Sequence, residues 1–558
     1  MAEAQGVPQP TRSWGPLEPL RERTFRRIWS SSLLSNFGAL ILGVGAAWEM
    51  THIADSPEMV ALVQTAMMLP LMLVSVPAGA VADMFDRRKV ALSGLGFAIL
   101  CSAGLTALAL FGLTTPWVLL GFCALIGVGV ALYGPAWQAS VREQVSAQQL
   151  PAAVALGSIS YNVARSFGPA IGGVIVLFAG AEAAFGVNTV CYLPLFAAFF
   201  FWRREPAPAR LPPERMDRAI VSGARYVIHS PPIRTVLARS LVYGLSGASV
   251  AALTPIVARD QLQGGAGVYG LLLGVYGAGA VAGALAIPKV RERMGTEQAV
   301  SVFAIVNGLM IMVIGLSHHT LLTAAAMTVA GAAWMLLAAM LNLGVQLSAP
   351  RWVTARALSW YMSALTGGMA VGAWIWGRTA ADYGVGEALL ISGGVLILSP
   401  LLGRVLPMPS VSVEETEPYE LGNEPQVAMA ITPRSGPVVI EVDYEVDPSL
   451  ARQFYDAMLK LQRARQRNGA FDWSLSRDIA DPAVWTERYL CPTWGDYLRL
   501  RSRFTHSDRA LQENAHAFAR NRATLAVRRK LERPFGSVRW RADTPDLGAN
   551  EPIVTYPP

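Results

Sequence analysis

The side chains that can do chemistry in this sequence are charged and polar residues set inside or beside long apolar stretches. One cluster of glycine, acids and bases follows the second of these stretches, at Gly79, Asp83, Asp86, Arg87, Arg88 and Lys89. Glycine lets two helices approach closely, a carboxylate can cap or pair with a helix end, and arginine can bind that carboxylate or helix carbonyls. The alternative is that these cations only fix the topology of the chain in a membrane.

Arg165 is the most informative single residue. It lies within the apolar stretch 152–178, about 20 Å from its start and therefore near mid-membrane. A charge at that depth is costly and usually functional. Asn162 and Gly168 lie one turn to either side on the same helix face. We interpret Arg165 as facing a cavity and attracting an anionic substrate group or a proton-carrying carboxylate. The alternative is a structural arginine bonded to loose carbonyls of a neighbouring helix.

Glu49 is the acid that we expect within the first apolar helix, near its outer end. It could carry a proton, or it could lie solvated at the membrane interface. No cofactor and no metal are expected, because the four cysteines form no CxxC pair and His318 and His319 have no third ligand close in sequence. No GxxxxGK[ST] sequence for nucleotide phosphates is present, which argues against ATP as the energy source.

Further polar and aromatic residues recur inside the apolar stretches. They could line a cavity or form hydrogen bonds between helices. The set comprises Asn36, Gln64, Gln138, Tyr161, Tyr243, Asn307, Asn342 and Gln346. Gly168 and Pro169 are expected to bend their helix, because proline removes one backbone hydrogen bond and clashes one turn back.

The apolar stretches define the elements that must position these residues. The sequence is 53% hydrophobic and 15% charged, whereas soluble domains carry about a quarter charged residues. A helix needs about 20 apolar residues to cross a bilayer. Twelve stretches qualify, at about 25–50, 58–82, 90–112, 116–140, 152–178, 184–202, 235–258, 267–288, 297–316, 320–346, 353–378 and 384–406.

Basic residues alternate between the loops and predict the orientation. Arginine and lysine gather in the N-terminal tail, at 87–89, in 203–234 and at 289–293. The loops expected on the other side of the membrane contain only one such residue, Arg259; they are 51–57, 113–116, 179–183, 259–266, 317–319 and 379–383. By the positive-inside rule, both termini are expected in the cytoplasm of a bacterial-type plasma (inner) membrane. The net charge of +7 is spread over these loops, so no nucleic acid is expected as a partner.

An internal repeat divides the helices into two halves. GAVADMFDRRK at 79–89 has a counterpart in GALAIPKVRER at 283–293, about six helices later, with Ile287 in place of Asp83. Two related six-helix halves are typical of transporters, with the substrate path at their interface. The expected organisation is a tail (1–23), a six-helix bundle (24–203), a linking loop (204–234), a second six-helix bundle (235–408), a linker (409–436), an α+β domain (437–545) and a tail (546–558).

The C-terminal part has the composition of an ordinary soluble domain. Strands are predicted at 438–446, 471–479, 485–491 and 535–542, with one helix ending at Gly469 and another beginning near Thr493. The order βαββαβ is ferredoxin-like. No nucleophile–base set is visible, so we expect a non-catalytic role such as self-association or regulation.

The cluster that begins at Gly79 resembles the signature of the major facilitator superfamily between the second and third helices. The resemblance implies that Asp83 and its arginines form a cytoplasmic latch that breaks when the two halves rock. Gly168-Pro169-x-x-Gly172-Gly173 resembles the end of the superfamily's antiporter motif, although Ala155 and Ala164 replace two of its glycines. In the superfamily, helices one, four, seven and ten line the cavity, which favours Asn36, Gln138, Tyr243, Asn342 and Gln346 as pathway residues.

Three longer stretches narrow the resemblance to the transmembrane secretion effector family, which includes the enterobactin exporters. They are LYGPAWQASVREQV, AAVALGSISYNVARSFGPAIGG and ARALSWYMSA. The resemblance implies proton-driven export of a small organic molecule, siderophore or drug-like, by alternating access. The C-terminal part is similar to the dimeric α+β barrel fold of antibiotic-biosynthesis monooxygenases. An importer of the same fold, a membrane-tethered enzyme and a transport-dead sensor remain open as alternatives.

Overall fold

The computed structural model describes most of the chain in two compact units. The described residues are 17–54, 56–146, 149–203, 223–350, 352–409, 431–522 and 527–532, with a few single positions at 417–429 and at 525. The first unit comprises 1–216, 238–341 and 362–407, and the second comprises 217–237, 342–361 and 408–558. Three long helices contribute residues to both units.

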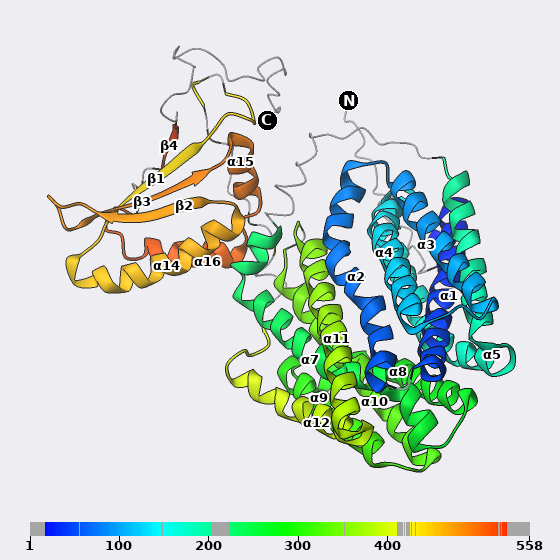
Figure 1. The fold of residues 1–558 in the computed structure, drawn as a ribbon. Coiled ribbons are helices and arrows are strands. Elements are labelled where there is room, and N and C mark those ends of the chain that lie inside the picture. The colour runs from blue at the N-terminus through cyan, green and yellow to red at the C-terminus, as the bar shows by residue number, and fades with distance from the viewer. Residues whose placement is uncertain are drawn as a thin grey trace, which may run out of the picture. The chain divides into compact units, whose positions relative to one another are not determined.

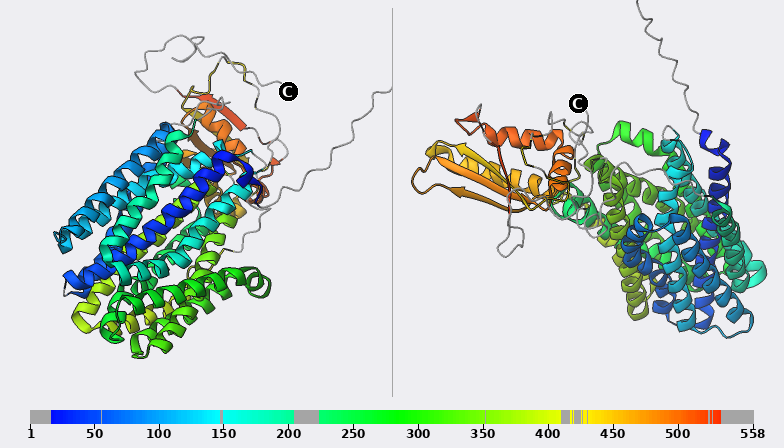
Figure 2. Two further views of the ribbon diagram at one scale, coloured as in Figure 1. Left: turned by 90° about the vertical axis from the view of Figure 1, so that its right-hand side faces the viewer. Right: turned by 90° about the horizontal axis from the view of Figure 1, so that it is seen from above.

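The helical part confirms the predicted membrane fold. The first half contains α1 (Arg23–Ile53), α2 (Pro57–Met84), α3 (Arg87–Leu110), α4 (Pro116–Ser140) and α5 (Leu150–Phe201). The second half contains α7 (Pro231–Ile256), α8 (Ala266–Arg293), α9 (Thr296–Leu316), α10 (Thr320–Ser348), α11 (Thr354–Tyr383) and α12 (Val385–Leu398). Ten of the described helices are long and apolar enough to cross a membrane. In Figure 2 the long helices of the first half lie alongside one another as a bundle.

The long helix α5 accounts for two of the predicted crossings. It changes direction at Gly180, whose φ of 81° and ψ of 173° are not helical. A positive φ is accessible to glycine at little cost, so Gly180 supplies the turn that the sequence predicted as a loop at 179–183. The helix continues through Pro169.

Helix starts are fixed by residues that the sequence places before each apolar run. Ser56 and Thr115 accept hydrogen bonds from the first turns of α2 and α4, each of which begins with a proline. Asp86 does the same for α3, where its carboxylate accepts from the amides of Arg88 and Lys89. Such caps satisfy amide groups that have no partner within the helix.

The C-terminal domain is a four-stranded antiparallel sheet covered by helices. Its strands are β1 (Val438–Glu445), β2 (Phe471–Arg477), β3 (Val484–Cys491) and β4 (Val527–Leu531), in the spatial order β2-β3-β1-β4. Helices α14 (Ala451–Asn468), α15 (Trp494–Ser502) and α16 (His506–His516) complete it, and Figure 1 shows α14 and α16 along one side of the sheet. The order confirms the ferredoxin-like prediction.

The strand at one edge of the described sheet was not predicted from the sequence. The fourth strand is Val527–Leu531, whereas 535–542 lies outside the described residues. The segment reads Val-Arg-Arg-Lys-Leu, and its charge hid the strand pattern. Those charges are paired in the sheet, where Lys530 contacts Glu441 at 2.7 Å and Arg528 contacts Asp443 at 2.5 Å.

Between the sheet and the helices lies a buried polar cluster centred on Glu487. This carboxylate is fully buried and accepts hydrogen bonds from Tyr444 (3.0 Å), Trp473 (2.9 Å) and Arg465 (3.4 Å). The guanidinium of Arg465 also lies 5.2 Å from the ring centre of Tyr489. Because the buried carboxylate accepts three hydrogen bonds, one of them from a cation, the cluster is tolerated in an otherwise apolar core.

We expect Glu487→Gln to destabilise the C-terminal domain by about 3–5 kcal/mol, because it leaves the buried Arg465 without a counter-charge. Hydrogen exchange of the β1 and β3 amides in the full-length protein measures the loss. Glu445→Gln, at an exposed position of β1, is the matched control and should leave exchange unchanged. Equal exchange in both variants would contradict the proposed role of the ion pair.

Candidate substrate-binding site and contacts between the two halves

The structure places Arg165 of α5 against the aromatic side chains of the second half. Its guanidinium carbon lies 5.8 Å from the ring centre of Trp334 on α10. Trp334 is stacked on Tyr243 of α7, with ring centres 4.3 Å apart, and the Tyr243 hydroxyl donates to the Trp334 carbonyl oxygen at 2.9 Å. Helices from both halves therefore meet at one cation and two rings.

This cluster retains unused hydrogen-bonding capacity. Trp334 is only 3% exposed, and its indole N–H has no hydrogen-bond partner among the described residues. Within the same part of the chain, no carboxylate forms an ion pair with Arg165. A guanidinium offers five N–H donors in a plane, which suits carboxylates and other planar oxygen anions. The arrangement can therefore bind an anion that also presents an aromatic or apolar surface.

The other predicted pathway residues have different surroundings. Asn36 donates to the hydroxyl of Ser160 at 3.3 Å, which joins α1 to α5. Gln138 is exposed on α4. Gln346 donates to Asn342 at 2.6 Å in the second unit. The side chain of Asn162 lies outside the described residues.

The charge cluster after α2 makes its described contacts within the first half. Arg87 binds Glu143 at 2.8 Å and the carbonyl of Ala139 at 3.0 Å, so it ties α3 to the end of α4. Arg88 donates to the carbonyls of Phe199 and Phe200 at the end of α5. A cation at a helix C-terminus is favoured by the exposed carbonyls. Gly79 and the side chain of Asp83 lie outside the part of this cluster that the structure describes.

The glycines of the second motif make close helix crossings. Gly168 and Gly172 face α1, where added β-carbons would lie 3.0 Å from Leu40 and 3.1 Å from Val44. Gly173 faces α8 of the second half, and its β-carbon would lie 2.3 Å from the α-carbon of Gly270. Residues 168–173 thus pack α5 against α1 of its own half and against α8 of the second half.

Sequence reasoning missed the contacts of Arg239, Arg259 and Arg378, which the structure shows between elements. Arg239 in α7 is 6% exposed and binds both carboxylate oxygens of Glu297, at 2.6 and 2.8 Å. Arg259 donates to the Thr51 carbonyl across the two halves. A charge inside the apolar stretch 235–258 was a visible signal for Arg239, whereas the interpretation of Arg259 considered only topology.

The contact of Arg259 belongs to a set that holds one end of the bundle closed. Trp48 of the first half stacks on Tyr269 of the second at 5.8 Å. Glu58 of the first half pairs with Arg378 of the second at 3.3 Å. Glu49 is half-buried at the same end, within electrostatic range of His52 and Glu182.

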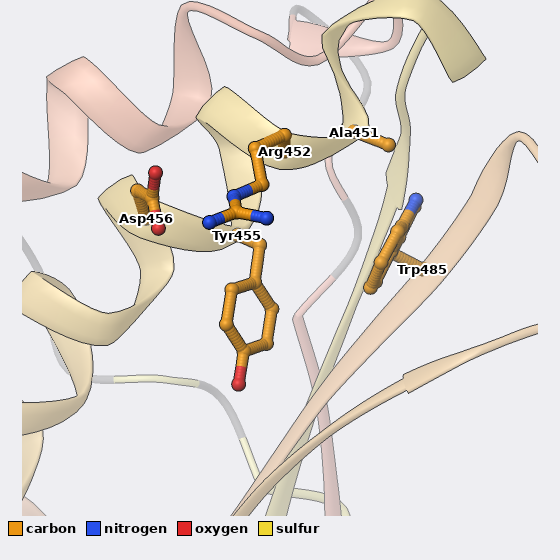
Figure 3. A pocket seen from close by; sticks show the side chains of 5 residues that line it. All are labelled: Ala451, Arg452, Tyr455, Asp456 and Trp485. Carbon is orange, nitrogen blue, oxygen red and sulfur yellow. The ribbon is translucent and has the colours of Figure 1, made fainter.

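The C-terminal domain has an open groove of about 430 Å³ between α14 and β3. Figure 3 shows Arg452, Tyr455 and Asp456 on the helix side and Trp485 on the strand side. These side chains provide one carboxylate, one guanidinium cation and two aromatic rings, and none of them is an activated nucleophile. Among the described residues, no group of three or more His, Cys, Asp or Glu side chains could hold a metal ion.

Comparisons with known proteins agree with the architecture. The model of a family described as transmembrane secretion effector matches residues 14–535, which includes the C-terminal domain. The staphyloferrin A transporter of Staphylococcus aureus is 26% identical over 271 residues, which cover 48% of this chain and 67% of that protein. The enterobactin exporter of Shigella boydii is 28% identical over 289 residues, which cover 48% of this chain and 63% of that protein.

Two solved structures show the same fold at low sequence identity. A bacterial homolog of the human lysosomal transporter Spinster, in an inward-facing and unoccupied conformation, is 12% identical with a TM-score of 0.56 and covers 70% of this chain and 96% of its own. The nucleoside transporter NupG is 12% identical with a TM-score of 0.53 and covers 69% of this chain and 99% of its own. At this identity they support the fold alone.

We expect Gly173→Val to destabilise the protein by about 1–3 kcal/mol, because the new side chain overpacks the crossing with Gly270. Thermal unfolding of the purified protein, followed by tryptophan fluorescence, measures the change. The control is Gly121→Val in α4, where an added β-carbon meets nothing within 4 Å. Similar losses in both variants would show that helix propensity, rather than the crossing, is responsible.

Proposed function

This chain belongs to the transmembrane secretion effector family, and we propose that it exports an anionic small molecule of the siderophore class by alternating access. That it is a multi-pass membrane transporter rather than an enzyme follows from the family. Direction, cargo and energy source are the proposal. The observation that carries the proposal is the position of Arg165 beside Trp334, where helices of both halves meet and no described carboxylate forms an ion pair with the guanidinium.

The chemistry of this cluster favours an anionic cargo. A guanidinium in a low-dielectric bundle attracts a carboxylate or a deprotonated catechol far more strongly than it would in water. The rings of Trp334 and Tyr243 add flat apolar surface for the body of the molecule. Two relatives are named for siderophore transport, one as an exporter. An exported siderophore would match both the charged and aromatic lining of the cluster and the names of these relatives.

The closed end of the bundle supports alternating access. We place this end outside the cell, by the basic loops, so the structure would correspond to the inward-facing state. Opening it must break the bond between Arg259 and Thr51 and the pair between Glu58 and Arg378. The pair between Glu58 and Arg378 is partly exposed and contributes little, and the bond of Arg259 can be exchanged for contacts at the other end.

We expect Arg165→Ala to raise the half-saturating cargo concentration about 10- to 100-fold, which corresponds to the loss of one charged hydrogen-bonding group. Uptake of enterobactin or staphyloferrin A into inverted vesicles measures this change. Arg165→Lys should recover part of the affinity, because it keeps the charge without the planar donors. The control is Arg203→Ala, at an exposed position after α5. Normal transport by Arg165→Ala would refute the site, whereas uptake only into right-side-out vesicles would show an importer.

We further propose that Glu49 carries the coupling proton, because it is a half-buried acid at the end that must open. Glu49→Gln is expected to make transport independent of an imposed proton gradient, since the amide cannot take up and release a proton. The rate of vesicle uptake with and without the gradient measures this. Glu387→Gln, an exposed acid at the start of α12, is the matched control. Gradient-dependent transport by the Glu49 variant would exclude this acid as the carrier.

A further inference from the structure

The second unit joins the C-terminal domain to short segments of the helical part. Residues 217–237 and 342–361 belong to the same compact unit as 408–558. The described contacts concern a short helix at 223–228 and Trp352, which lies two residues before α11. Because α7, α10 and α11 continue from these segments into the first unit, any restraint on the segments acts on the ends of those helices.

Two aromatic rings lie at the centre of this contact. Tyr226 meets Trp352 edge to face, with ring centres 5.3 Å apart, and Tyr226 is only 3% exposed. The C-terminal domain supplies a guanidinium to each ring, with Arg467 at 5.6 Å from the centre of Tyr226 and Arg503 at 4.0 Å from that of Trp352. Cations are attracted to the faces of aromatic rings, so the pairs Arg467–Tyr226 and Arg503–Trp352 stabilise the contact.

A hydrogen bond fixes the register of the contact. Arg225 donates to the carbonyl oxygen of Gly469 at 3.0 Å. Gly469 ends α14 with a φ of 123°, a conformation that suits glycine. The carbonyl that accepts the hydrogen bond from Arg225 therefore belongs to the glycine that ends α14.

The docking face is held in place from within the domain. Arg467 pairs with the fully buried Asp508, which also accepts from Asn468 at 2.8 Å and from the amide of Thr505 at 3.1 Å. Thr505 and Asp508 form the capping box of α16. The same network that starts α16 thus orients the cation over Tyr226, which makes the face preorganised rather than a loose tether.

We propose that the C-terminal domain is a built-in regulator that docks on residues 223–228 and Trp352 and holds the transporter in the conformation of the structure. A contact made in one state and lost in another shifts the balance by its free energy. The docked domain therefore favours the state in which the Thr51 end is closed, and its release favours opening of that end. The inference rests on alternating access as proposed above.

The test uses Arg503→Glu in the full-length protein in lipid nanodiscs, with Trp352→Leu as a second variant that breaks the same pair from the helical side. Hydrogen exchange of residues 223–228 reports docking, and the alkylation rate of a Thr51→Cys reporter reports opening. The four native cysteines are buried. The control is Arg463→Glu, an exposed residue of α14 one turn before Arg467.

Both docking variants are expected to raise exchange at 223–228 and reporter alkylation about two- to fivefold, whereas the control leaves both unchanged. Unchanged exchange at 223–228 in both variants would overturn the docking contact. Raised exchange with unchanged alkylation would overturn the regulatory role. Neither result depends on cargo binding, so the outcome for Arg165→Ala judges the proposed function separately.

Discussion

The cost of a charge surrounded by lipid is the constraint on which the rest of the helical part depends. A guanidinium at mid-membrane is retained only where protein groups surround it. Arg165, expected at that depth, lies beside Trp334, whereas Arg239 lies near the start of α7 and binds both oxygens of Glu297 in the first turn of α9. The two solutions differ, because Arg239 is neutralised by an acid whereas Arg165 faces rings. One arginine is thus neutralised within the fold, whereas the other forms no ion pair with a carboxylate among the described residues.

The sequence predicts the features that depend on amino-acid composition and on the spacing of hydrophobic residues. The apolar stretches, the repeat and the order βαββαβ follow from hydrophobicity, basic loops and turn residues, and the structure bears out this fold. The place of Arg165 inside a long apolar helix followed from its position in the sequence. Its aromatic partner could not be foreseen, because Trp334 lies in the other half, and nothing in the sequence shows which helix faces meet.

The failures have physical causes of the same kind. Strand β4 was missed because Arg528 and Lys530 look like solvated charges until Glu441 and Asp443 are placed opposite them. The contact of Arg259 with Thr51 joins residues more than two hundred positions apart through a backbone carbonyl, which leaves no side-chain signal. Which residues pair across a sheet or a helix interface depends on the tertiary structure, so the pattern of neighbouring residues in the sequence does not predict these pairs.

The charged face of the sheet also bears on how the C-terminal domain meets other molecules. Along β1, the side chains that alternate with the core are Glu441, Asp443 and Glu445. Lys530 and Arg528 of β4 pair with Glu441 and Asp443, and Arg488 of β3 pairs with Asp472 and Glu532. The dimeric α+β barrel resemblance would have two such faces pack together, yet burying this one would desolvate a lattice of ion pairs. Aromatic rings and cations lie instead at the α14–α16 end, where Tyr226 and Trp352 meet Arg467 and Arg503. The polarity of the two surfaces therefore favours docking on the chain's own helices over pairing of two sheets.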